Sequence, residues 1–303
     1  MSYFSILVDT GCDLSQEYLD EHNIASVPIP FHIDGVQHNL GRWQEITYEE
    51  FYTRLRNGSV VGTALMSPEV YVEIFTEYAA RNEDLLVVTM SSGLSNTYLN
   101  CIYAANELKE PYPDWKVRII DCMTAAAGCG LITIKAVRKR AEGVSLEDVY
   151  EQLKDIPVRL FSLFTVNDLM YLHRGGRLGK LQAVAGSIMG VKPILNVSPD
   201  GTLKLKDKAR GRKAAMDMLV AQMKRSLNEG TKLDMVIVTH AHSPEDGEML
   251  AGLVKEAVEV DEIIIEPMGP VIAAHSGPGT LAIFFTADMT RTEYEEKFYG
   301  GEK

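Results

Sequence analysis

The sequence lacks several features that whole classes of protein require. Its 303 residues include four cysteines, none in a CxxC pair and none in a Cys/His cluster with zinc-site spacing. No apolar run approaches the roughly 20 residues that span a bilayer, and the first residues do not resemble a secretory leader. We therefore expect a cytoplasmic protein without stable membrane insertion, with reduced thiols at Cys12, Cys101, Cys122 and Cys129.

An excess of basic charge is also missing. The chain has 42 Asp and Glu against 30 Lys and Arg, which gives a formal net charge of -12. Such a balance argues against nucleic acid as a partner, because phosphates would be repelled. Hydrophobic residues make up 46% of the chain, enough for a large core and an internal cavity.

The motifs of common enzyme classes are absent as well. The chain has no G-x-x-x-x-G-K-[ST] and no G-x-G-x-x-G, so a phosphate or nucleotide enzyme is a minor alternative. It also has no G-x-S-x-G. A serine hydrolase would have to combine Ser92 or Ser95 with His275 and an acid such as Asp9. We expect no cofactor and no metal site.

Apolar runs of strand length alternate with amphipathic segments of helix length. This pattern predicts an α/β fold with an N-terminal parallel-sheet domain, helices on both of its faces, and a C-terminal α+β domain. The capped helix that ends at Pro157 predicts a boundary between residues 1–157 and 158–303. The strands are expected at 4–9, 24–31, 85–90, 116–121, 158–166, 192–210 (a hairpin), 233–240, 262–266 and 280–286. Helices are expected at 14–22, 46–58, 67–82, 95–109, 126–142, 211–228 and 244–258, with a helical turn at 167–173 and a polar, fraying tail.

Hydroxyl groups gather where predicted strands end. The stretch "LLVVTMSSGLSNTYLN" (85–100) places five Ser and Thr residues at the end of a buried strand and just after it. Polar residues also follow the predicted strands 4–9 and 116–121. The carboxyl ends of parallel strands form the usual binding crevice. Hydroxyls and helix N-terminal N–H groups there predict a site for an acidic group. The alternative for each single hydroxyl is an ordinary helix N-cap.

Two later segments are unusual. "HRGGRLGK" (173–180) places paired glycines in a basic cluster of an acidic protein. "GPVIAAHSGPGTLAIFF" (269–285) places His275 in a Gly/Pro turn between two apolar runs. Such a turn lets a ligand approach the backbone closely.

These segments together resemble a known family. The ordered set "VDTGCDLS", "GTALMSP", "SSGLSNTY", "IIDCMTAAAGCG", "YLHRGGRLGK", "VKPIL", "KARGRKAA" and "HSGPGTLAIFF" is similar to the DegV family of bacterial fatty-acid-binding proteins over nearly the whole chain. The resemblance implies one long-chain fatty acid buried between two domains. It also implies a partner fatty acid kinase, which phosphorylates the carboxylate with ATP to an acyl phosphate for phospholipid synthesis, while the binding protein does no bond chemistry.

The resemblance also implies site residues. Thr63 and Ser95 match the family's carboxylate contacts, and His275 lies near the same head group. Arg210 matches an arginine that hydrogen-bonds or faces the partner. Arg177 is expected near the mouth of the site and the kinase interface, where Arg174 extends the basic patch.

The sequence departs from the family pattern in two places. Ala64, Leu65 and Met66 replace Ser-Gln-Pro after Thr63, and Asn96 replaces a glycine beside Ser95. Asn tolerates left-handed backbone geometry, so the turn is expected to survive and Asn96 to line the site. Because of the change at residues 64–66, the main alternative is a protein of this fold that binds another acidic lipid or apolar carboxylate. The ligand tail requires an apolar tunnel, with candidates Leu160, Phe161, Leu163, Phe164, Ile188, Met189, Ile194, Leu195, Phe284 and Phe285.

Overall fold

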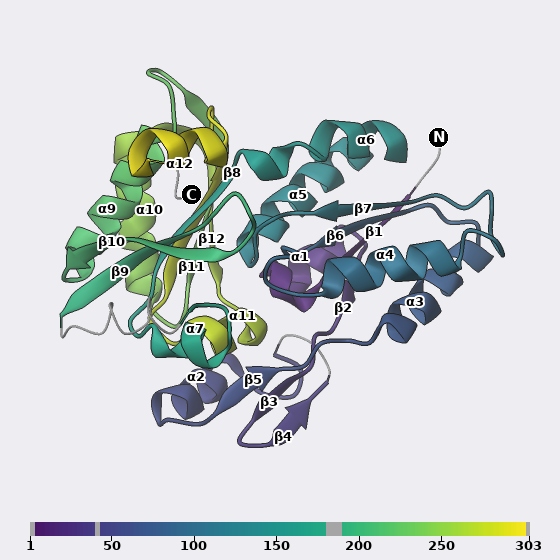
Figure 1. The fold of residues 1–303 in the computed structure, drawn as a ribbon, viewed down its shortest axis with the longest axis horizontal. Coiled ribbons are helices and arrows are strands. Elements are labelled where there is room, and N and C mark those ends of the chain that lie inside the picture. The colour runs from purple at the N-terminus through teal and green to yellow at the C-terminus, as the bar shows by residue number, and fades with distance from the viewer. Residues whose placement is uncertain (1–3, 40–42, 180–189, 301–303) are drawn as a thin grey trace.

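A computed structural model describes residues 4–39, 43–179 and 190–300. Within these ranges the strands form three sheets, of four, six and three strands. Figure 1 shows the two larger sheets side by side with helices between and around them. The predicted fold class is confirmed: a parallel-sheet N-terminal part with helices on both faces is followed by a part with a mixed sheet.

The N-terminal sheet is parallel throughout, in the order β2-β1-β6-β7. Its strands are β1 (Ser5–Asp9), β2 (Ile24–Val27), β6 (Leu85–Thr89) and β7 (Val117–Asp121). Side chains alternate between its faces, so Leu86 and Val88 pack in one core cluster, whereas Leu85 and Val87 pack in another. One face is covered by α3 (Pro68–Ala80) and α4 (Thr97–Glu107), and the other by α1 (Gln16–Glu21), α5 (Ala127–Ala141) and α6 (Leu146–Leu153).

The C-terminal sheet has the order β10-β9-β8-β13-β11-β12, and β11 and β12 are its parallel pair. Apolar residues of one face pack against helices α9, α10 and α12. Its strands are β8 (Leu160–Thr165), β9 (Val191–Val197), β10 (Leu203–Arg210), β11 (Lys232–His240), β12 (Glu259–Pro267) and β13 (Leu281–Thr286). The helices are α9 (Arg212–Arg225), α10 (Pro244–Ala257) and α12 (Arg291–Tyr299).

Helix α5 lies between the two large sheets (Figure 1). Ten of its fifteen residues are buried, because apolar side chains cover it on both sides. One hydrophobic cluster runs from Leu86 of the N-terminal sheet through Ile132 of α5 to Phe284 of the C-terminal sheet. The expected boundary near residue 157 falls in the short 3₁₀ helix η2 (Ile156–Val158), and the division into two domains stays a prediction.

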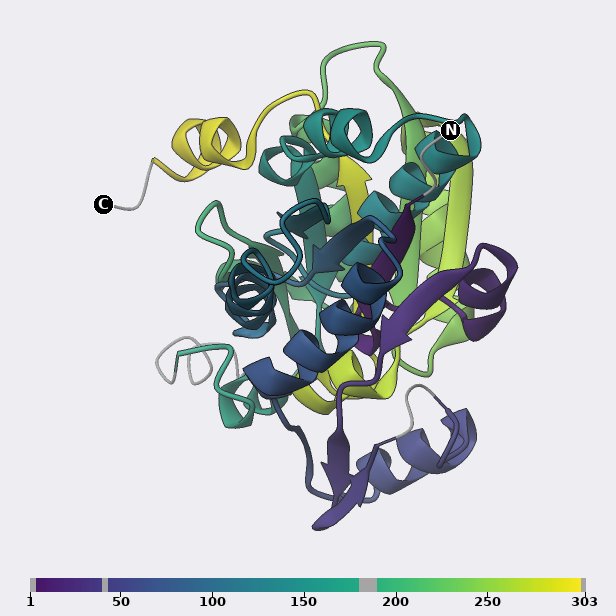
Figure 2. The same ribbon diagram turned by 90° about the vertical axis from the view of Figure 1, so that its right-hand side faces the viewer.

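A third, antiparallel sheet was not predicted. It has the order β4-β3-β5, and α2 (Tyr48–Arg56) packs beside it; Figure 2 shows it below the large sheets. The predicted single strand 24–31 is wrong, because Pro28 and Pro30 separate β2 from β3. Phe31 and Ile33 of β3 share a core cluster with Met268, and the Tyr52 hydroxyl of α2 donates to the Met268 carbonyl oxygen at 2.8 Å, so this N-terminal sheet and its helix pack on the C-terminal half. Its strands are β3 (Phe31–Ile33), β4 (Val36–His38) and β5 (Val61–Thr63).

Two more expectations are wrong. His275 does not lie in a turn but in the last part of helix α11 (Pro270–Ser276), which starts with proline and ends at Gly277 with φ 79°. The expected fraying tail contains α12, which a capping box between Thr290 and Glu293 begins. The helical turn near 170 is α7 (Met170–Arg174).

Candidate functional site

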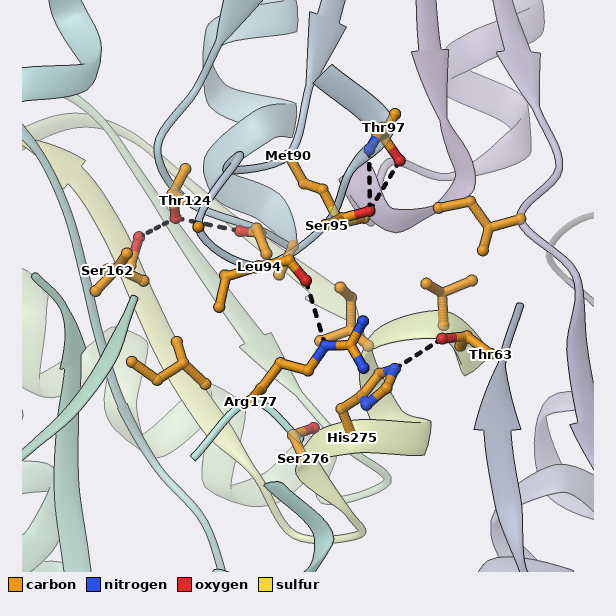
Figure 3. A pocket seen from close by; sticks show the side chains of 18 of the residues that line it. Thr63, Met90, Leu94, Ser95, Thr97, Thr124, Ser162, Arg177, His275 and Ser276 are labelled. Atoms are coloured by element: carbon orange, nitrogen blue, oxygen red, sulfur yellow. Dashed lines mark hydrogen bonds between the residues drawn. The ribbon is translucent and has the colours of Figure 1, made fainter. Parts of the chain in front are cut away.

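A cavity of about 370 Å³ lies between the two large sheets. The loops that follow β5, β6 and β7 form part of its wall, and α7, α11 and strands of the C-terminal sheet form the rest. Its volume falls within the range of roughly 300–1,000 Å³ typical of small-molecule pockets. Figure 3 shows the polar side chains of its wall in separate groups, with apolar side chains between them.

One polar group joins Thr63 to His275. Thr63 is the last residue of β5, and His275 lies near the end of α11. The Thr63 Oγ1 and His275 Nε2 atoms are 2.8 Å apart and hydrogen-bonded (Figure 3). Residues 212 positions apart in the sequence thus form one hydrogen-bonding unit in the cavity wall.

The His275 ring is neutral at pH 7. Burial, together with the nearby positive charge of Arg177, lowers its pKa from the ordinary 6.5 to about 4. Nδ1 is buried and has no hydrogen-bond partner among the described residues. A proton on Nε2 rather than Nδ1 avoids an unsatisfied buried N–H. His275 then donates to Thr63, and the Thr63 hydroxyl proton remains free for a ligand oxygen.

The hydroxyl-rich stretch at the end of β6 has two roles. The hydroxyl of Thr89, the last residue of β6, donates to the Ile120 carbonyl of β7, and the Ser91 hydroxyl donates to the Gly201 carbonyl at 2.8 Å, so these two join neighbouring backbone segments. Ser95 and Thr97 line the cavity, and their hydroxyl oxygens are 2.9 Å apart. Ser95 also accepts from the Thr97 backbone N–H, so it serves the start of α4 as well as the cavity.

Asn96 lines the cavity beside Ser95, but its backbone differs from expectation. Its φ of -78° is not left-handed, so the turn does not need the residue that replaces the family's glycine to adopt that conformation. Ala64, Leu65 and Met66 also line the cavity, where they supply apolar surface in place of a hydroxyl, an amide and a proline. The Met66 carbonyl accepts from Asn100 Nδ2 at 2.8 Å, which ties this segment to α4.

The three predicted arginines lie in different places. Arg177 lines the cavity, half-buried, where its guanidinium donates to the Leu94 carbonyl (Figure 3) and to the Gly175 carbonyl. Arg174 is exposed and stacks over the Tyr171 ring at 4.7 Å. Arg210 is exposed at the end of β10. Neither Arg174 nor Arg210 is part of the cavity wall formed by the described residues.

Strand alternation decides which predicted tunnel residues face the cavity. Phe164 and Phe284 line it, because even-numbered residues of β8 and β13 point toward α5. Leu160 and Leu195 pack in the same cluster without lining the cavity. Ile188 and Met189 lie outside the described residues. The others pack on the opposite face against α9 and α10: Phe161, Leu163, Ile194 and Phe285.

Sequence reasoning missed a second polar pair in the wall. Thr124 follows β7, Ser162 lies in β8, and their buried hydroxyls are hydrogen-bonded to each other (Figure 3). The polar position within "LFSLFT" was the available signal for Ser162. Apolar residues that were also missed line the space between the polar groups: Met90, Leu94, Leu172 and Val271.

The geometry does not form a Ser-His-Asp relay. His275 is bonded to Thr63 rather than to a serine, and Asp9 Oδ1 accepts from the Gly11 N–H at 2.8 Å. In 4–39, 43–179 and 190–300, no three His, Cys, Asp or Glu residues are grouped to hold a metal ion. No helix in those ranges is long and apolar enough to cross a membrane.

Comparison with known proteins defines the class. Residues 3–288 match the family described as "Uncharacterised protein, DegV family COG1307", so the chain belongs to the DegV family. A DegV domain-containing protein of Clostridium perfringens is 33% identical over 291 residues, 95% of this chain and 99% of the relative.

Two solved structures carry ligand information. The chain is similar to a Thermotoga maritima protein whose structure is described as revealing fatty acid binding function, with a TM-score of 0.82, 29% identity and coverage of 95% and 100%. It is also similar to a stearic acid-binding protein of Eubacterium ventriosum, with a TM-score of 0.82, 27% identity and coverage of 96% and 99%.

Proposed function

We propose that the protein binds one long-chain fatty acid in this cavity, with the carboxylate at the Thr63–His275 end. The observation that carries the proposal is the hydrogen bond between Thr63 and His275 in the wall of a cavity that many apolar side chains also line. The fatty-acid-binding relatives support the same ligand class. Ser95 and Asn96 line the same cavity and complete the proposed head-group site.

The energetics favour this orientation. A C16 tail has about fourteen methylenes, and burying them at roughly 0.8 kcal/mol each gives a gross gain of about 11 kcal/mol. Each hydrogen bond to the carboxylate adds roughly 1.5–3 kcal/mol at most. The apolar wall therefore supplies most of the affinity, whereas the Thr63 and Ser95 hydroxyls fix which end of the ligand lies near His275.

We further propose that the bound carboxylate is presented to a partner fatty acid kinase, which forms the acyl phosphate used in phospholipid synthesis. Neutral hydroxyl donors and a neutral His275 leave a carboxylate oxygen more nucleophilic than a tight ion pair would. Arg177 at the cavity and the exposed Arg174 and Arg210 are assigned to partner contact. The protein itself does no bond chemistry in this scheme.

Binding and presentation are tested separately. Calorimetric titration with palmitate is expected to give one site per chain, and Thr63→Val is expected to weaken it while Thr63→Ser does not. Acyl phosphate formation with a bacterial fatty acid kinase and ATP is expected to fall in Thr63→Ala and Ser95→Ala. If the wild-type protein binds palmitate fully but yields no acyl phosphate, the proposal of a fatty-acid ligand stands and the proposal of a kinase partner is overturned.

A further inference from the structure

A second cleft, of about 450 Å³, lies at the ends of elements from both halves of the chain. Four basic side chains line it: Arg56 from the end of α2, Lys192 from β9, Arg212 from the start of α9 and His242 after β11. We call this set the basic cleft. Pro278 and Gly279 also line it, whereas Ser276 and Thr280 line the fatty-acid cavity, so the turn before β13 borders both spaces.

The cations of the basic cleft are incompletely neutralised. Asp246 is the carboxylate in its wall and lies 2.9 Å from the Arg212 guanidinium. Lys192 Nζ instead donates to the Asn167 amide oxygen at 2.8 Å, and Arg56 donates to the His242 carbonyl at 2.9 Å. Neither Lys192 nor Arg56 forms an ion pair within the described part of the chain.

The charge balance therefore remains positive. Arg56, Lys192 and Arg212 carry three positive charges against the single charge of Asp246. Even with Glu49, whose carboxylate bonds the His242 ring at 2.8 Å, one positive charge is in excess. Burial and the charge of Arg212 lower the pKa of Lys192, as expected for cations held close together. This cluster lies in a protein of net charge -12.

A donor in the basic cleft also lacks an acceptor. Arg212 Nη1 is buried and makes no hydrogen bond to any described residue. An unsatisfied buried guanidinium N–H is costly, and a bound anion would remove that cost. Helix α10, fourteen residues long, begins at the cleft beside Ser243, but Glu245 and Asp246 in its first turn offset the positive end of its dipole, so the attraction rests on the Arg and Lys side chains.

We propose that the basic cleft binds a phosphoryl anion, either free phosphate or the phosphate of a nucleotide. A phosphoryl group offers negative charge that offsets the excess, together with oxygens that accept from Arg212 and Lys192. The site is separate from the fatty-acid cavity, and the inference does not depend on the proposed fatty acid. The turn before β13, which borders both spaces, would then connect the two ligand sites.

The test is calorimetric titration of the full chain with phosphate, pyrophosphate and ADP at fixed ionic strength, with acetate as the anion control. Pyrophosphate is expected to bind saturably and more tightly than acetate. Lys192→Gln and Arg212→Gln are expected to weaken it at least tenfold, the effect of one lost charge-assisted hydrogen bond. Lys213→Gln is the matched control, because the Lys213 side chain is 73% exposed on α9. The affinity of this variant for pyrophosphate should not change.

A variant that is expected to increase the affinity distinguishes a lost binding contact from misfolding. Asp246→Asn removes the carboxylate of the basic cleft and is expected to tighten pyrophosphate about threefold to tenfold. If ADP binds with the same affinity as pyrophosphate, the site recognises the phosphoryl group alone. If ADP binds tenfold more tightly, the site recognises a nucleotide. Both results support the proposal. No saturable binding, binding no tighter than that of acetate, or equal affinity in Lys192→Gln would overturn it. Palmitate titration of the same samples reports the fatty-acid site independently.

Discussion

The His275 ring lies directly against the backbone of Gly175. A methyl group at Gly175 would overlap His275 Nδ1, so the ring position requires glycine there. Gly175 has φ -71°, which any residue adopts, so the requirement concerns space rather than backbone conformation. The paired glycines of "HRGGR" and the histidine of "HSGPG" thus form one structural unit that holds the ring toward Thr63.

Gly175→Ala is predicted to displace the His275 ring and break its hydrogen bond to Thr63. Fatty-acid affinity should fall by about tenfold, because Thr63 would no longer be held in place for its own hydrogen bond to the charged carboxylate. Isothermal calorimetry with palmitate measures the change. Gly179→Ala is the matched control, because no described residue lies within 4 Å of a Cβ there. Equal affinities of the two variants would contradict the role of the ring.

Ala282→Leu is predicted to shorten the ligand that the cavity accepts. Ala282 lines the cavity from β13, and added methyl groups would occupy ligand volume. Displacing two or three methylenes at roughly 0.8 kcal/mol each would weaken C16 and C18 acids by about 15- to 60-fold and shorter acids less. A chain-length series measured by calorimetry checks this.

Ile283→Leu is the control for that series. Ile283 is the next residue of β13, but its side chain packs on the opposite face, in the cluster with α9 and α10. It should leave the chain-length preference unchanged. An identical loss for short and long acids in Ala282→Leu would show that the cavity does not hold the tail there.

The affinity for fatty acids is predicted to be constant between about pH 6.5 and 8.5. The pKa of His275 is lowered to about 4, so the ring stays neutral throughout this range and no positive charge is lost as the pH rises. His275→Gln should bind nearly as well as the wild type, because an amide also donates to Thr63. A tenfold gain in affinity as the pH falls from 8 to 6 would indicate an imidazolium and contradict the neutral ring.

Asp9→Asn is predicted to stabilise the protein at neutral pH. Burial raises the pKa of Asp9 from 3.8 to about 6, and its Oδ2 has no partner among the described residues. The folded state then binds more protons than the unfolded state between these two values, so the Asp9 contribution to stability falls as the pH rises through them. Asparagine keeps an acceptor for the Gly11 N–H without the charge.

Urea unfolding at several pH values measures this effect. The gain of Asp9→Asn should be about 1–3 kcal/mol at pH 7.5 and should shrink toward zero near pH 4. The same gain at both pH values would show that the charge of Asp9 is not its cause.

Much of the fold follows from sequence patterns, and the reasons are local. The runs at 85–90 and 233–240 predict β6 and β11, because buried strands read as continuous apolar runs. Strand β5 was missed, because its three residues Val61–Thr63 are too few to show a period. Helix α11 was missed because its seven residues lie between proline and glycine, which also mark a turn.

The candidate site was less accessible to sequence reasoning. Local patterns pointed to the stretch around Ser95 and to His275, whereas Thr63 and the carboxylate-binding roles came from family resemblance. Nothing local in the sequence predicts that β5 and α11 meet. Alternation within β8 separates Phe164 from Phe161, so the tunnel residues follow only once the cavity-facing side is known. The basic cleft joins residues from 56 to 279 and has no sequence motif.

Native mass spectrometry of the purified protein, followed by organic extraction, shows whether the cavity holds a fatty acid. We expect one co-purified fatty acid of about C14–C18 per chain, or uptake of one when it is added, and we expect Thr63→Val to retain less of it. A protein that is empty and takes up no added fatty acid would overturn the proposed ligand and would mean that the segment Ala64–Met66 has changed the ligand of this fold.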